Sequence, residues 1–233
     1  MVFAGRQFQD RHHAGRELAQ ALLPLAVPDP IVLALPRGGV PVAYEVAKAL
    51  KAPLDLLFVR KIGAPGYEEV GLGAVVDGQD PQVVFNEEAM AAFSPSAAYI
   101  EQQRLRELEE IERRRAAYLR GRPALPVKGR NVILVDDGIA TGGTVRAGLL
   151  GLKRSAAGTV VLAVPVAPQE VLKNLGQSAD EIICLSSPDI FRAVGLHYET
   201  FEQTSDAEVV ELLDQARGWS ESPASAPDSP SPA

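Results

Sequence analysis

The stretch of residues 132–144 constrains this chain more than any other part of its sequence. It reads Val-Ile-Leu-Val-Asp-Asp-Gly-Ile-Ala-Thr-Gly-Gly-Thr, so two acids and a loop of small residues follow four apolar residues. The apolar run predicts a short buried strand, and the spacing after the loop predicts a helix. Paired carboxylates suit vicinal hydroxyls or a hydrated cation, and a glycine-rich loop that opens a helix offers free N–H groups to a phosphate. Together they predict a pocket for a phosphorylated sugar; the alternative is a polar turn with a helix cap.

The apolar pattern elsewhere predicts an α/β fold. Short apolar runs predict strands at 31–35, 54–59, 131–135, 159–164 and 181–185. Helical spacing predicts helices at 10–23, 40–50, 144–155, 168–175 and 206–217. A strand, a loop, a helix and a strand follow one another from residue 31 to residue 59. This βαβ order indicates a parallel, twisted sheet that is flanked by helices.

Residues 62–120 interrupt this alternation and predict an insertion. Its first part is rich in glycine, which indicates a mobile or hairpin-rich segment, and 73–76 with 82–85 predict a β-hairpin. Residues 96–119 predict a long helix with a narrow apolar stripe and Glu–Arg pairs at i,i+4 spacing. This helix is either a solvated helix docked on the domain, or a subunit-contact arm or lid support.

Length and composition favour one domain with a tail. A chain of 233 residues suits a single α/β domain with additions, which we place at 1–219. Residues 220–233 are almost entirely Ser, Pro and Ala, so we expect a disordered tail there.

Charge and hydropathy narrow the class of partner. The net charge is −7 and the basic residues are dispersed, which argues against non-specific binding of nucleic acid. No apolar run approaches the roughly 20 residues that span a bilayer, and the first residues lack the apolar core of a signal peptide. The single cysteine, Cys184, excludes a disulfide within the chain and suits a small buried residue. We therefore expect a cytoplasmic protein without a membrane partner.

Residues 132–144 resemble the signature with which type I phosphoribosyltransferases bind phosphoribosyl pyrophosphate (PRPP). From about residue 5 to 218, the chain is similar to a bacterial group of phosphoribosyltransferases of unsettled substrate. That group shares Asp-Arg-x-x-Ala-Gly-Arg, here residues 10–16, and Leu-Pro-Arg-Gly-Gly, here residues 35–39. The resemblance implies a Rossmann-like core with a small C-terminal hood, for which residues 186–204 are the candidate. It also implies a Mg²⁺-dependent transferase of nucleotide metabolism that ribosylates a nitrogenous base with PRPP and releases pyrophosphate.

The resemblance assigns the ribose 5-phosphate part of PRPP to the signature. Asp136 and Asp137 would bind the ribose hydroxyls, and Asp137 would assist proton transfer at the incoming base. The remaining PRPP contacts of the signature would come from Gly138, Ala140, Thr141, Gly142, Gly143 and Thr144. The helix that begins near the last of these adds a favourable dipole, worth on the order of 1 kcal/mol.

Arg37, Gly38 and Gly39 occupy the place of the family's pyrophosphate loop. A fixed cation and exposed backbone N–H groups would make an anion nest there, and the alternative is an ordinary βα turn with a surface arginine. Family members often have a cis non-proline peptide bond in this loop, which we expect at Pro36–Arg37. We expect Arg37 to act in catalysis together with the acid pair.

Arg60 and Lys61 stand where the family's flexible catalytic loop begins. Residues 63–73 would form a lid with glycine hinges that closes over PRPP. One or both cations would contact pyrophosphate, and we expect Lys61 to be catalytic; the alternative is a solvated surface pair.

The acceptor and the metal are less constrained. Phe191, Tyr198 and Phe201 in the hood either stack on a planar base or pack the C-terminal helix. Mg²⁺ is implied because pyrophosphate leaves poorly unless it is neutralised, and this ion usually takes substrate oxygens and water. We therefore expect no dedicated protein ligands for the metal. A homodimer is the family default.

Three functions are compatible with these residues. The first is PRPP-dependent transfer to a nitrogenous acceptor. The second is a PRPP-binding regulator without turnover, and the third is action on another phosphosugar. A regulator of DNA or RNA would add a basic face or a DNA-binding module, and the sequence has neither, which favours the enzyme.

Overall fold

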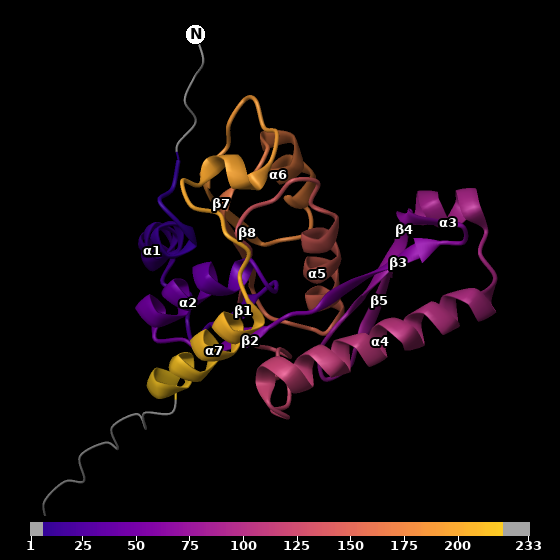
Figure 1. The fold of residues 1–233 in the computed structure, drawn as a ribbon, viewed down its shortest axis with the longest axis horizontal. Coiled ribbons are helices and arrows are strands. Elements are labelled where there is room, and N and C mark those ends of the chain that lie inside the picture. Colours follow the sequence, from indigo (N-terminus) through magenta and orange to yellow (C-terminus); the bar gives the residue numbers. More distant parts are fainter. Residues whose placement is uncertain (1–6, 221–233) are drawn as a thin grey trace, which may run out of the picture.

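The structure, a computed structural model, describes residues 7–220 and is built on a five-stranded sheet (Figure 1). The strands lie in the order β2-β1-β6-β7-β8, and every neighbouring pair is parallel. Their bounds are β1 Ile31–Ala34, β2 Leu54–Leu56, β6 Val132–Val135, β7 Val160–Val166 and β8 Glu181–Ser186. The predicted fold class, a parallel sheet flanked by helices, is confirmed.

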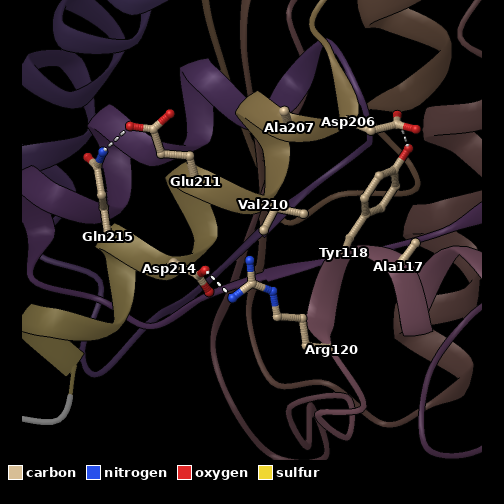
Figure 2. A pocket seen from close by; sticks show the side chains of 9 residues that line it. All are labelled: Ala117, Tyr118, Arg120, Asp206, Ala207, Val210, Glu211, Asp214 and Gln215. Atoms are coloured by element: carbon tan, nitrogen blue, oxygen red, sulfur yellow. Dashed lines mark hydrogen bonds and ion pairs between the residues drawn. The ribbon is translucent and has the colours of Figure 1, made fainter.

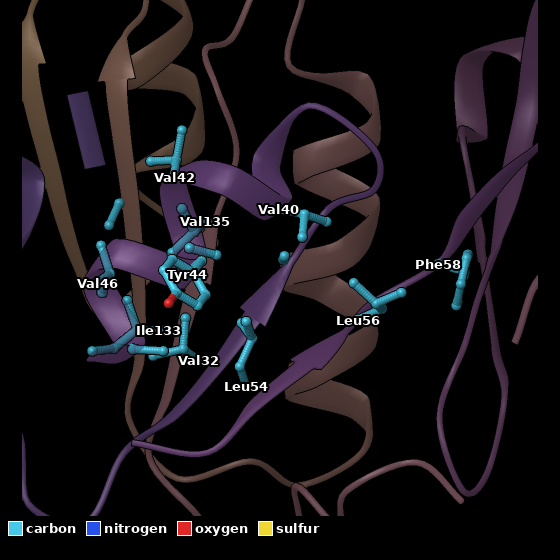
Figure 3. Packing of buried hydrophobic residues seen from close by; sticks show 14 of the residues in the cluster. Val32, Val40, Val42, Tyr44, Val46, Leu54, Leu56, Phe58, Ile133 and Val135 are labelled. Atoms are coloured by element: carbon cyan, nitrogen blue, oxygen red, sulfur yellow. The ribbon is translucent and has the colours of Figure 1, made fainter. Parts of the chain in front are cut away.

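Helices cover both faces of this sheet. Their bounds are α1 Arg11–Leu22, α2 Gly39–Leu50, α5 Gly143–Arg154, α6 Gln169–Leu175 and α7 Asp206–Ser220, with 3-10 turns η1 Leu23–Leu25 and η2 Val194–His197. Successive strand residues face opposite sides of a sheet. Val32 and Ile133 therefore pack with α2 (Figure 3) and, in the same cluster, with α1 and α7. The next residues, Leu33 and Leu134, pack with α5. The two layers bury the side chains of β1, β2, β6 and β7, whereas those of the edge strand β8 are at most half-buried.

Part of the predicted tail and the chain's beginning lie outside the described residues. The helix α7 continues to residue 220, so the first residue assigned to the tail is helical. Residues 221–233, on which the rest of that prediction falls, are outside the described part, as are residues 1–6.

The predicted insertion forms a second, antiparallel sheet that projects from the core (Figure 1). Its elements are β3 Val59–Ala64, β4 Tyr67–Val76, β5 Gln82–Phe85, α3 Glu87–Phe93 and α4 Ala97–Leu119. The predicted hairpin is confirmed as β4–β5, and the predicted long helix is confirmed as α4. Among the helices that the structure describes, none combines the length and apolar character needed to cross a bilayer.

The prediction of one strand over residues 54–59 is wrong. The strand β2 ends at Leu56, and β3 begins at Val59. Between them the chain changes partner, because the carbonyl of Phe58 already accepts a hydrogen bond from the N–H of Asp77 at 2.9 Å. The apolar run therefore serves two sheets, parallel in its first half and antiparallel in its second.

Residues 63–73 form two paired strands joined by a turn at 65–66, so of the two predictions for this glycine-rich segment, mobile or hairpin-rich, the structure shows the hairpin. A Cβ atom on Gly63 would lie 2.8 Å from the carbonyl oxygen of Glu68. One on Gly73 would lie 2.3 Å from the carbonyl oxygen of Val84. These glycines let neighbouring strands approach closely, so their presence indicates tight pairing in the insertion.

A buried ion cluster ties α4 to both sheets. Arg115 of α4 pairs with Asp77, which follows β4, and its Nη2 lies 3.8 Å from Oδ2 of Asp55 in β2. Their side chains are 13%, 5% and 6% exposed, in that order. Asp55 also accepts hydrogen bonds of 2.8 Å from the N–H groups of Leu56 and Leu125. Burial raises the pKa of both carboxyls, and the charge of Arg115 opposes the rise.

Candidate active site

The acid pair lies at the centre of the carboxyl edge of the parallel sheet. The strand β6 is the middle strand, and Asp136 and Asp137 follow its last residue directly. Ligands of open parallel sheets bind in crevices at this edge. The structure therefore places both acids where the sequence predicted them.

The loop between β1 and α2 lies against these acids. Its Pro36–Arg37 peptide bond is cis, as the resemblance implied. A Cβ atom on Gly38 would lie 2.1 Å from Oδ2 of Asp137, and one on Gly39 would lie 2.8 Å from the carbonyl oxygen of Val135. The backbone of this loop and the acid pair therefore form one continuous surface.

Burial opposes negative charge on both acids. Burial raises the pKa of Asp136 well above its ordinary value, and the neighbouring charge of Asp137 raises it further. Burial also raises the pKa of Asp137, against the opposing charge of Arg11. Oδ1 of Asp136 accepts a hydrogen bond of 2.9 Å from the N–H of Asp137. Ionised carboxylates in such surroundings gain strongly from a ligand that brings hydrogen-bond donors or positive charge.

Arg11 is a site residue that the sequence prediction missed. Its Nε donates to Oδ2 of Asp137 at 2.8 Å, and its Nη1 donates to the carbonyl oxygen of Glu202 at 2.7 Å. Its guanidinium also lies 3.8 Å from the ring centre of Phe201. The available signal was the stretch 10–16, which supplied a resemblance but no role for this arginine.

The structure gives reasons for other residues of that stretch. Asp10 caps α1, because its side chain accepts a hydrogen bond of 2.6 Å from the N–H of His13. A Cβ atom on Gly15 would lie 2.7 Å from the carbonyl oxygen of Val42, so this glycine lets α1 cross α2 closely. The cap and the close crossing fix the start of α1 and, with it, the position of Arg11.

The loop that opens α5 presents free backbone groups. Gly142 precedes the helix with a φ of 78°, and no side chain caps the helix N-terminus. Ala140, Thr141, Gly143 and Thr144 are exposed, and a Cβ atom on Gly143 would meet nothing within 4 Å. Gly138, in contrast, is buried under Val194 of the hood, since its Cβ would lie 2.6 Å from that side chain. The exposed part of this loop can hold an anion. The two buried glycines of the loop, Gly138 and Gly142, determine the path of its backbone.

The structure does not join Arg60 and Lys61 to the acid pair. Nε of Arg60 lies 2.7 Å from Oε2 of Glu107 in α4. Nζ of Lys61 lies 3.3 Å from the carbonyl oxygen of Glu69 in β4. Both cations thus have their contacts within the insertion, whereas the resemblance implied contact with pyrophosphate.

Arg37 is held by α7 in this structure. Its Nη1 lies 3.1 Å from Oδ1 of Asp206, which also accepts a hydrogen bond of 2.7 Å from the hydroxyl of Tyr118. Asp206 stands at the edge of an open cavity of about 800 Å³ between α4 and α7 (Figure 2). The cavity is lined by Ala117, Tyr118, Arg120, Asp206, Ala207, Val210, Glu211, Asp214 and Gln215. It lies beside the candidate site, and the acid pair is not among its lining residues.

The hood aromatics mostly pack against protein. Tyr198 is 3% exposed and donates its hydroxyl to the carbonyl oxygen of Asp137 at 2.5 Å, so in this structure it packs within the protein, the second of its two predicted roles. Phe201 has Arg11 over its ring and lies 5.0 Å from Tyr198 between ring centres. Phe191 stacks on His197 at 5.4 Å. Phe201 is 37% exposed, and the other exposed large apolar side chains of the hood are Ile190 and Leu196, which the sequence prediction missed.

Metal-binding side chains do not gather into a cage in the part of the chain that the structure describes, where no group of three or more His, Cys, Asp or Glu converges. His12 instead lies 2.9 Å from Glu45 of α2, and His197, the last residue of η2 in the hood, is buried. The oxygen donors at the sheet edge are those of the acid pair.

Comparisons with known proteins identify the family to which this chain belongs. The profile of the phosphoribosyl transferase domain matches residues 11–200. Proteins from two Mycobacterium tuberculosis strains, H37Rv and CDC 1551, carry phosphoribosyl transferase as a provisional name and are 46% identical over 209 residues. The match covers 90% of this chain and 47% of theirs, so the chain spans about half the length of these relatives. The crystal structure of TT1426 from Thermus thermophilus is 42% identical with a TM-score of 0.80, over 90% of this chain and 98% of that one.

Proposed function

Because this chain belongs to the phosphoribosyltransferase family, we propose that it transfers the phosphoribosyl group of PRPP to a nitrogenous base and releases pyrophosphate. One observation carries the proposal. The acid pair, the Arg37 loop and the exposed amides before α5 meet at one edge of the sheet, and they suit the three parts of PRPP.

The acid pair would bind the ribose. Asp136 and Asp137 accept hydrogen bonds from the 2′- and 3′-hydroxyls, which relieves the cost of their partly buried charge. In the reaction, the bond between the anomeric carbon and the pyrophosphate oxygen breaks, and a bond to the acceptor nitrogen forms. Positive charge grows on the sugar, and two nearby carboxylates stabilise it. The acceptor nitrogen loses its proton to Asp137 or to solvent.

The phosphates would occupy the two loops. The N–H groups at Gly143 and Thr144 face the 5′-phosphate at the N-terminus of α5. Arg37 exchanges its contact with Asp206 for the pyrophosphate, which the amides of Gly38 and Gly39 also line.

The donor set at the sheet edge fits a magnesium ion that arrives on the substrate. Two carboxylates are too few for a protein cage, and Mg²⁺ usually keeps several waters and takes phosphate oxygens. When bound, the ion neutralises the leaving pyrophosphate. The protein's own part is to hold the pyrophosphate in the Arg37 loop.

The acceptor would lie under the hood. Val194 packs directly on Gly138, so η2 stands next to the acid pair. Leu196 of η2 and Ile190 are 63% and 78% exposed and offer apolar surface to a planar base. We propose that these two residues, in place of the buried Tyr198, contact the acceptor, and that the protein works as a homodimer.

Binding of PRPP without turnover is the second candidate. The observation that favours it is the placement of Arg60 and Lys61, whose contacts lie within the insertion. If the insertion never closes over the acid pair, PRPP binds but the pyrophosphate lacks two of its expected cations.

Turnover distinguishes the two candidates. The protein is incubated with PRPP, Mg²⁺ and a panel of purine, pyrimidine and other nitrogenous bases, and pyrophosphate release is followed. We expect release with one class of base, which identifies the acceptor. Binding of PRPP by calorimetry without release with any base would favour the regulator, and absence of binding would contradict both.

Gly38→Ala tests the contact between the two loops. The new methyl group would overlap Oδ2 of Asp137, so one of the two loops must move. We expect PRPP binding to weaken about tenfold and the free energy of unfolding to fall by about 1–3 kcal/mol. Gly218→Ala is the matched control, because a Cβ there meets nothing within 4 Å. Unchanged PRPP affinity in Gly38→Ala would show that this contact does not shape the site.

A further inference from the structure

Asp137 is held from three directions. Arg11 of α1 donates to its Oδ2 at 2.8 Å, and the backbone of Gly38 lies against the same oxygen. Tyr198 of the hood donates to its carbonyl oxygen at 2.5 Å. Two parts of the chain therefore hold the carboxylate of Asp137 and a third holds its backbone, whereas the carboxylate of Asp136 is bonded by the next backbone N–H.

Arg11 is itself rigidly placed. Its side chain is 11% exposed, and it makes three contacts that use different parts of the guanidinium. Nε meets Asp137, Nη1 meets the carbonyl oxygen of Glu202, and the plane covers Phe201. Holding a surface arginine in one geometry costs side-chain entropy, but Arg11 is fixed by its two hydrogen bonds and by the ring of Phe201.

These contacts connect the sugar site to the hood. Glu202 and Phe201 belong to the segment that follows η2, and Asp137 belongs to the loop after β6. Arg11 bridges the two, and Asp10, the cap of α1, fixes the backbone from which it extends. Nε and Nη1 are both engaged by protein, and the contact of Arg11 with the acid pair is through Asp137.

We propose that Arg11 is a positioning residue for PRPP, which holds the Asp137 carboxylate toward the ribose and couples that carboxylate to the hood. This inference rests on the proposed function. It predicts that the arginine matters through its fork of N–H groups as well as its charge, because a lysine cannot reach both Asp137 and Glu202 from one planar group.

The test is a double-mutant cycle read by calorimetric titration of Mg²⁺-PRPP into the full chain. The variants are Arg11→Gln, Asp137→Asn and the two together, with Arg11→Lys as the conservative variant. We expect Arg11→Gln to weaken PRPP binding about tenfold to a hundredfold. In the Asp137→Asn background the same change should weaken binding little further, because the group that Arg11 positions is already altered. Arg11→Lys should recover part of the loss.

Arg16→Gln is the matched control on the same helix, since Arg16 is 54% exposed and lies 3.6 Å from Glu45. Thermal unfolding of each variant reports whether the fold is kept. Full additivity of the two substitutions would overturn the proposal, because a role of Arg11 in packing alone persists without the Asp137 charge. Wild-type affinity in Arg11→Gln would also overturn it. If the wild-type protein itself fails to bind Mg²⁺-PRPP, the proposed function fails first, and the proposal for Arg11 fails with it.

Discussion

Asp136→Asn is expected to lower turnover on the order of a thousandfold and, at the same time, to stabilise the fold at neutral pH. The loss of turnover follows if the carboxylate binds a ribose hydroxyl and stabilises the positive sugar. The gain in stability follows from burial, which raises the pKa of Asp136 well above its ordinary value, with the charge of Asp137 adding to the rise. An ionised group in such a place opposes folding.

The sign of the pH dependence is fixed by that raised pKa. Folded protein holds the Asp136 proton to higher pH than unfolded protein does, so stability falls as pH rises from the unfolded pKa through the folded one. Above both pKa values, the free energy of unfolding is lowered by the full amount. That amount is about 1.4 kcal/mol for each unit by which the folded pKa exceeds the unfolded one. Asparagine removes the charge and keeps an oxygen for the N–H of Asp137. Its advantage should therefore be largest at pH 7–8 and shrink toward pH 4.

Urea unfolding of wild-type and variant protein across this pH range measures the difference. Asp29→Asn is a suitable control, because Asp29 is 81% exposed and pairs with Arg130 at the protein surface. A variant that is less stable than the wild type at pH 7 would mean that the carboxylate is stabilised by the fold. The acid pair would then be a structural feature and not a site prepared for a ligand.

The features that the sequence predicted well are those encoded in short segments. Apolar runs mark the strands, and the two acids follow β6 directly, so local pattern was enough to place them at the carboxyl edge. The Pro36–Arg37 loop was predictable for the same reason, as it lies between a clear strand and a clear helix. No tertiary contact had to be known for either.

The features that it missed depend on contacts between distant segments. Arg11 and Asp137 are 126 residues apart and meet only because α1 packs at the sheet edge. Arg60 stands beside Lys61 in the sequence, and nothing local shows that Glu107 binds one of them. The burial of Tyr198 similarly depends on Phe8, which belongs to the segment before α1.

Arg115→Met is expected to cause the largest loss of stability, about 3–5 kcal/mol at pH 7–8, because it leaves two buried carboxyls without their cation. Asp77 loses its ion pair and keeps the hydrogen bond from the N–H of Gly78, while Asp55 keeps its two backbone hydrogen bonds and the charge of Arg122. Chemical unfolding monitored by circular dichroism measures the loss. Arg113→Met is the matched control on the same helix, since Arg113 is 68% exposed, and it should leave stability unchanged.

The loss in Arg115→Met should shrink as the pH falls toward 5. The charge of Arg115 opposes the rise in the pKa of Asp55 and Asp77 that burial causes, so without it both carboxyls keep their protons to higher pH. Burying a protonated carboxyl costs much less free energy than burying an ionised one. The destabilisation of the variant should therefore disappear as the pH falls through the raised pKa values. Adding Asp77→Asn to Arg115→Met should recover much of the stability for the same reason. If the loss of stability is independent of pH and is not recovered by Asp77→Asn, the role of Arg115 is instead its packing against Phe58.

This variant also separates the insertion from the sugar site. The cluster joins α4 and the end of β4 to β2, whereas the acid pair follows β6 in the middle of the core sheet. Loosening the cluster should free the insertion, and with it Arg60 and Lys61, before it disturbs Asp136. At a temperature where Arg115→Met is still folded, PRPP affinity should therefore stay close to that of the wild type while turnover changes. An equal loss of PRPP affinity and of turnover would mean that the two sheets act as one unit and that the insertion is not an independent lid.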